Sequence, residues 1–69
     1  MKHHYRIMVK NGNGRFMPIQ GFVDGKPLFA VNVMYGLVLW DVDDSLKESR
    51  FKEIMDKYPN EQFDFRRTL

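Results

Sequence analysis

The sequence has no cysteine in its 69 residues, so it can form neither a disulfide nor a thiolate metal site. Small domains often depend on such supports, and packing or self-association must replace them here. The longest apolar run, residues 28–42, is interrupted by Asn32, Gly36 and Asp41 and falls short of the roughly 20 residues that span a bilayer. The opening MKHHYRIMVK lacks the apolar segment of a signal peptide. We therefore expect a soluble, cytoplasmic protein that contacts no membrane.

The net charge is only +2, yet the charges are unevenly placed. Residues 1–27 have Asp24 as their one acid, against the bases Lys2, Arg6, Lys10, Arg15 and Lys26. This imbalance predicts a basic face on the N-terminal part. A hydrophobic content of 43% with 14% aromatic residues is typical of a folded chain. We expect a single domain over residues 1–69.

Alternation of apolar and polar residues predicts a strand over residues 3–10. One side of it carries Tyr5, Ile7 and Val9, and the other carries His4, Arg6, Met8 and Lys10. Asn11-Gly12-Asn13-Gly14 predicts a hairpin with a type I′ turn, followed by a strand over residues 15–23. Pro18 cannot donate to a strand ladder, so it should lie at an edge or a bulge. Asp24-Gly25 predicts a second hairpin turn.

Residues 28–41 are almost continuously apolar and should break near residues 32–36 into two strands. Because these strands barely alternate, we expect them at the centre of a sheet with both faces covered. A last strand over residues 62–67 places Phe63 and Phe65 on one side and Asp64 and Arg66 on the other.

One helix is predicted over residues 45–58, with Ser45 and Glu48 forming a capping box. Two pairs of opposite charge at i,i+4 spacing support it, Glu48 with Lys52 and Glu53 with Lys57. Pro59 should end it. Its apolar side comprises Phe51, Ile54, Met55 and Tyr58.

The order β-β-β(-β)-α-β predicts an α+β fold, a small and mainly antiparallel sheet with one amphipathic helix on one face. One helix covers only one face, so the second face should be polar, dimeric or a binding surface. The predicted core comprises Tyr5, Ile7, Val9, Ile19, Val31, Leu37, Leu39, Phe51, Ile54, Met55, Phe63 and Phe65. Trp40 should anchor either this core or an interface.

In residues 37–46, LVLWDVDDSL, an apolar strand ends in acidic residues. This segment resembles the first motif of the haloacid dehalogenase superfamily of phosphatases, a buried strand followed by Asp-x-Asp-x-Thr. The resemblance implies Asp41 as nucleophile and Asp43 as acid–base around Mg²⁺, with Ser45 in place of the family's threonine. Only a helix and one short strand follow, whereas each parallel strand needs a crossover of a dozen or more residues. Since the family's other motifs have no room, we predict no enzyme, no catalytic residue and no cofactor.

The same aspartates can simply precede the helix, whose N-terminal partial positive charge stabilises them. Clustered carboxylates also suit a hard cation. The sequence leaves open whether Asp41, Asp43 and Asp44 bind one, and we predict no metal site. His3 and His4 are neighbours that face opposite sides of a strand, so they do not chelate one ion together. We expect both in a frayed, solvated terminus.

We expect a non-catalytic binding module that acts by protein–protein contact. Its size is typical of stand-alone regulators or inhibitors encoded by phages and mobile elements, which is an association and not a mechanism. A homodimer through the uncovered sheet face is compatible with the pattern. The partner would meet the hairpin face or an edge strand that contains Pro18.

The alternative is a single-stranded nucleic-acid-binding domain, because cations interleaved with aromatic rings hold single strands. Gln20-Gly21-Phe22-Val23 also resembles a fragment of the RNA-recognition signature. The candidate binding residues for the two hypotheses are Arg6, Lys10, Arg15, Phe16, Met17, Phe22, Tyr35 and Trp40.

Overall fold

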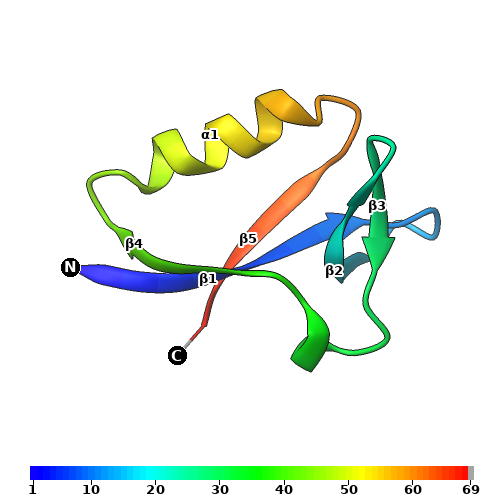
Figure 1. The fold of residues 1–69 in the computed structure, drawn as a ribbon, viewed down its shortest axis with the longest axis horizontal. Helices are drawn as coiled ribbons and strands as arrows, with labels where there is room; N and C mark the ends of the chain where they lie inside the picture. The colour runs from blue at the N-terminus through cyan, green and yellow to red at the C-terminus, as the bar shows by residue number, and fades with distance from the viewer. Residues whose placement is uncertain (69) are drawn as a thin grey trace.

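The computed structural model describes residues 1–68, which form five strands and one α-helix (Figure 1). In chain order the elements are β1 (Lys2–Lys10), β2 (Phe16–Val23), β3 (Lys26–Phe29), the 3₁₀ turn η1 (Val33–Tyr35), β4 (Val38–Asp43), α1 (Lys47–Lys57) and β5 (Phe63–Thr68). Every strand pair is antiparallel. This architecture confirms the predicted α+β class.

β1 is the centre of the sheet because both of its edges are hydrogen-bonded. One edge pairs with β5 over residues 4–9. On the other edge β4 pairs with residues 2–6 and β2 with residues 8–10, so these two strands follow one another along β1. At their junction Leu37 donates its N–H to the Ile19 carbonyl at 2.7 Å and accepts from the Ile7 N–H at 3.1 Å.

The prediction that residues 28–41 supply the central strands is therefore wrong. β3 pairs only with β2 and lies at the end of the sheet, and β4 pairs only with β1. The predicted break near residues 32–36 is confirmed, because η1 occupies it. Asn32 forms this turn by accepting a hydrogen bond from the Met34 N–H on its side chain.

The two hairpin loops differ in their turn chemistry. Asp24 and Gly25 both have positive φ, 52° and 78°, which makes the predicted second turn type I′. In the first loop only Gly14 has positive φ, and the Asn11 side chain accepts from the N–H groups of Asn13 and Arg15. The result is a three-residue loop with a left-handed glycine, so the type I′ prediction is wrong there.

Pro18 lies where β2 leaves β1. It is the last β2 residue in register with β1, opposite Met8, and its carbonyl accepts from the Ala30 N–H. Beyond it β2 pairs with β3, with a register irregularity between Ile19 and Gly21. The absent N–H of Pro18 thus falls where the strand changes partner, next to the irregularity that the sequence predicts.

α1 covers one face of the sheet and η1 lies on the opposite side (Figure 1). On the helix side Phe51 meets the Tyr5 ring edge-on at 5.0 Å between centroids, and Ile54 packs against the core. The β2–β3 hairpin closes one end of this layer, where Phe22 stacks on Tyr58 at 3.6 Å. The core therefore lies between α1 and the side of β1 that the alternation predicts.

Most of the predicted core is confirmed, with three exceptions. Val31, Leu37 and Met55 are exposed, Val31 by 83%. Val31 follows the end of β3 in the connection to η1, where no element covers it. Met8, Ala30 and Val42 are buried although the sequence does not place them in the core. Met8 faces away from α1 and lies opposite Pro18, so a second, smaller buried region exists on that side.

α1 begins at Lys47, two residues later than predicted, and ends at Lys57 before Pro59. Lys52 forms an ion pair with Asp56, at 2.7 Å, in place of the expected pair with Glu48. Within residues 1–68, no helix has the length and apolar character that crossing a bilayer requires.

Ile19→Ala should lower the free energy of unfolding by about 2–5 kcal/mol, because Ile19 is fully buried in the core. Val31→Ala should change it by less than about 0.5 kcal/mol, although the apolar run alone suggests that Val31 is buried. Urea unfolding followed by circular dichroism measures both. An equal loss in the two variants would contradict the observed burial.

Candidate functional site

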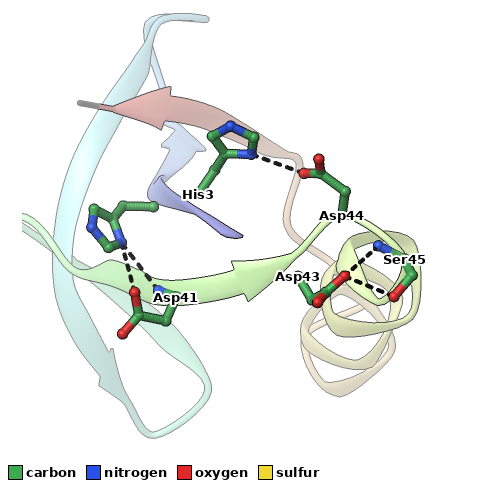
Figure 2. Close-up of polar contacts among 6 residues, drawn as sticks. His3, Asp41, Asp43, Asp44 and Ser45 are labelled. Atoms are coloured by element: carbon green, nitrogen blue, oxygen red, sulfur yellow. Dashed lines mark hydrogen bonds and ion pairs between the residues drawn. The ribbon is translucent and has the colours of Figure 1, made fainter. Parts of the chain in front are cut away.

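The acid-rich corner, residues 41–45, joins β4 to α1, and its three carboxylates point in different directions (Figure 2). The Asp41 carboxylate lies 4.0 Å from His4 Nδ1. The Asp44 carboxylate accepts from His3 Nδ1 at 2.9 Å. The Asp43 carboxylate turns back to Ser45. The Asp43 and Asp44 carboxylates are thus hydrogen-bonded to different neighbours, and the Asp41 carboxylate lies nearest a third residue, His4.

This divergence separates the residues that the phosphatase resemblance would bring together. Nucleophilic and acid–base carboxylates must face one reacting group, whereas the Asp43 carboxylate turns to Ser45 and the Asp41 carboxylate lies beside His4. Across residues 1–68, no three His, Asp or Glu side chains are arranged to hold a metal ion. The corner connects β4 to α1 through the contacts of Asp43 and Asp44.

Ser45 does not form the predicted capping box. Its N–H and its hydroxyl both donate to the Asp43 carboxylate, at 3.0 and 2.8 Å. The chain is therefore held in a turn at Ser45, and α1 starts only after Leu46, which makes no side-chain cap. The hydrogen bonds from Ser45 lower the pKa of the Asp43 carboxyl below its ordinary value.

His3 and His4 lie within β1, so the expectation of a frayed terminus is wrong. They face opposite sides, as the alternation predicts, and each binds the acid-rich corner. A carboxylate only accepts, so His3 donates its Nδ1 proton to Asp44. This hydrogen bond lowers the pKa of the Asp44 carboxyl. His4 Nδ1 instead accepts from the Asp41 N–H at 3.0 Å.

A β-bulge displays Trp40. The register between β1 and β4 shifts between His3 and Tyr5, and Asp41 has φ = 53°, in the left-handed region. The extra residue re-aims the adjacent side chain, a common use of bulges near functional sites. Trp40 is 65% exposed and meets the His4 ring edge-on at 4.6 Å between centroids. A large aromatic ring is therefore held in a defined position and still faces solvent.

We call the sheet surface opposite α1 the open face. Cross-strand partners share a face, which assigns its members from the registers. They are His4, Arg6, Met8 and Lys10 of β1, Phe16 and Pro18 of β2, Val38 and Trp40 of β4, and Asp64, Arg66 and Thr68 of β5. It combines cations with aromatic rings: the Lys10 ammonium lies 5.9 Å from the Phe16 ring centroid.

η1 crosses one end of the open face. The Arg6 guanidinium donates to the Val33 carbonyl. A Cβ added to Gly36 would meet Pro18 Cβ at 2.9 Å and the Arg6 guanidinium at 3.2 Å, so this glycine permits the close approach. η1 thus belongs to the same side of the molecule as Trp40.

Exposed apolar side chains follow one another along this part of the chain. We call them the apolar strip: Leu28, Val31, Val33, Met34, Tyr35, Leu37 and Trp40. Met34 is 83% exposed, which is extreme for a large apolar residue. Seven exposed apolar residues within 13 positions of the chain are a candidate interaction segment, whereas singly scattered ones are ordinary.

The structure divides the predicted binding residues into two groups. Arg6, Lys10, Phe16 and Trp40 lie on the open face, Tyr35 lies in η1 and Arg15 is exposed beside the first hairpin loop. Met17 and Phe22 do not join them. Met17 lies opposite the core residue Val9, and Phe22 stacks on Tyr58.

Sequence reasoning missed Arg66 as a site residue. The pairing of β5 with β1 places it directly opposite Arg6. Alternation assigns Arg66 to the side away from Phe63 and Phe65, but which strand pairs with β5 is decided by the fold.

Asp44→Asn should lower the urea midpoint at pH 7 by removing the acceptor of the His3 hydrogen bond. Because the pKa of Asp44 is lowered by folding, its contribution is complete above the unfolded value of about 4 and is lost as the pH falls through the folded value. The difference from the wild type should therefore shrink below about pH 4. Asp24→Asn, in an exposed turn, is the control. A difference that stays constant down to pH 2 would contradict this account.

Asp41→Val should cost about 1–2 kcal/mol of unfolding free energy, since a β-branched residue is strained at positive φ. Asp41→Asn and Asp41→Gly should cost less, because both residues tolerate this backbone conformation. All three keep the backbone N–H that His4 accepts, so denaturant unfolding isolates the strain. Equal stability of the valine and asparagine variants would show that the bulge does not need this conformation.

Residues 1–68 enclose no pocket. Comparisons of the chain with protein-family models, with curated proteins and with solved structures found no match.

Proposed function

We propose that this chain is a non-catalytic binding module that acts by contact with a partner protein. The contact is made by the apolar strip together with the open face. The observation that carries the proposal is the exposure of the apolar residues between β3 and β4, with Trp40 at one end. Leaving these side chains in water forgoes the free energy of their burial, which a partner would recover.

The residue types support a protein interface. Tryptophan, tyrosine, methionine and arginine are enriched in such interfaces, and tryptophan and arginine are frequent hot spots. Trp40 is held by the bulge and by His4, so docking on it would cost little side-chain entropy. The partner would lose access to whatever surface it places on this strip, which is how a small regulator or inhibitor acts by occlusion.

Docking through an edge strand at Pro18 is less favoured than docking on the face. Pro18 packs beside Gly36, and its carbonyl already accepts the Ala30 N–H. Backbone pairing by a partner needs free groups along an edge. The open face needs no such groups, because side chains make the contact.

Binding of single-stranded nucleic acid is the second candidate, and the shared face of Arg6, Lys10 and Phe16 favours it. Two features oppose it. The carboxylates of Asp41 and Asp64 lie on the same side and would repel a phosphate backbone. The aliphatic members of the apolar strip offer no ring on which a base can stack. We therefore rank protein contact first.

Trp40→Ala should weaken the affinity for a captured and purified partner by about tenfold or more, as truncation of a hot spot does. Met34→Ala should weaken it as well. Met55→Ala on α1 is the matched control and should leave the affinity unchanged, because Met55 is exposed on the helix. Isothermal titration calorimetry measures all three dissociation constants.

Two results would contradict the proposal. One is an equal loss of affinity in the Met34 and Met55 variants. The other is binding of single-stranded oligonucleotides whose log affinity falls steeply with log salt, which would support the nucleic-acid candidate instead.

A further inference from the structure

Two arginines share the centre of the open face. Arg6 of β1 and Arg66 of β5 are direct cross-strand partners, so their side chains leave the sheet on the same side. Cβ atoms of such partners lie about 4.5–5.5 Å apart, and like charges in this position are destabilising. The fold therefore places two like-charged residues in direct cross-strand register.

The chain compensates this charge only in part. Arg66 Nε donates to the Asp64 carboxylate at 2.8 Å. Arg6 donates to the neutral Val33 carbonyl and makes no ion pair among the described residues. The Asp64 carboxylate thus pairs with Arg66 alone, and Arg66 remains about half exposed, with donors still available.

The arginine pair lies beside the ring that the bulge displays. His4 precedes Arg6 by two residues on the same side of β1, and its ring contacts Trp40. Residues two apart on a strand are neighbours on one face. Along β1 the surface therefore runs from an aromatic ring to a pair of cations, and then to η1.

We propose that the partner presents an acidic segment, whose carboxylates pair with Arg66 and Arg6 while an adjacent apolar side chain packs on Trp40. This inference rests on the proposed function and names the chemistry of the partner. Arginine forks bind carboxylates in a bidentate manner, and such bonds are stronger than those between neutral groups. A carboxylate placed there would also relieve the repulsion between the two guanidiniums.

Charge favours an acidic segment over the two other possible occupants of the open face, a second copy of the chain and a nucleic-acid strand. A second copy docking face to face would bring its own Arg6 and Arg66 near these, since a two-fold contact joins identical patches. A nucleic-acid strand would bring phosphates past Asp41 and Asp64. A short acidic segment needs carboxylates only at the two arginines, whereas a nucleic-acid backbone brings a charge with every nucleotide.

A selection of displayed random 12-residue peptides on the immobilised full chain, at 150 mM NaCl, tests this inference. Enriched sequences should contain Asp or Glu next to an apolar residue. Synthetic versions should change the fluorescence of Trp40, the only tryptophan in the chain. Replacing their acids by the corresponding amides should weaken binding by about tenfold.

Arg66→Gln should weaken binding of the acidic peptides by about tenfold, while the matched control Arg50→Gln, on exposed α1, should leave it unchanged. Trp40→Ala should abolish enrichment of the same peptides. Circular dichroism of every variant checks that the fold is retained.

The outcomes separate the inference from the function on which it rests. Enriched peptides that are neutral or basic but lost with Trp40→Ala would overturn the acidic partner and leave protein contact standing. Peptides that are insensitive to Trp40→Ala, or no enrichment at all, would overturn both. Self-association that Arg66→Gln strengthens, or a twelve-nucleotide oligothymidine that binds more tightly than the peptides, would replace the acidic segment by another occupant.

Discussion

The hydrogen bonding of β1 along both edges is the constraint on which the rest of the molecule depends. β5 takes one edge, and β4 and β2 share the other, meeting at Leu37. A strand fixed in this way cannot slip by one residue without exchanging its two faces. Tyr5, Ile7 and Val9 are therefore committed to the helix side, and every charged residue that alternates with them is committed to the opposite side.

A chain with one α-helix leaves that opposite side without a second helical layer. η1 covers one end of it through Arg6 and Pro18, and Met8 is buried beneath. The remainder exposes Trp40 and the apolar strip. Since a small domain gains little stability per residue, apolar side chains left in water are a real cost. A partner that covers them is the physical reason we give for this arrangement.

The acid-rich corner also helps to position the exposed Trp40. His3 binds Asp44 and His4 binds the Asp41 backbone, so two neighbouring residues of β1 fasten the end of β4 from both sides of the strand (Figure 2). Asp43 meanwhile shapes the turn into α1 through Ser45. The bulge at Asp41 lies next to Trp40, and the His4 ring both accepts the Asp41 N–H and contacts the Trp40 ring.

The sequence by itself determined the class of fold, the faces of β1, the turn at Asp24-Gly25 and the existence of α1, because these follow from local periodicity and turn chemistry. It also placed Arg6, Lys10 and Trp40 among the binding candidates. Only the tertiary structure decided that β1 is central, that Val31 is exposed and that Arg66 faces Arg6. Strand pairing joins residues some 60 positions apart, which local sequence patterns do not reveal. An apolar run also has the same sequence whether its side chains are buried in the fold or exposed for a partner to cover. The capping-box prediction is wrong for a related reason. Both the Asp43 and the Glu48 carboxylates can accept from the Ser45 N–H, and in the structure the nearer residue in sequence, Asp43, accepts it.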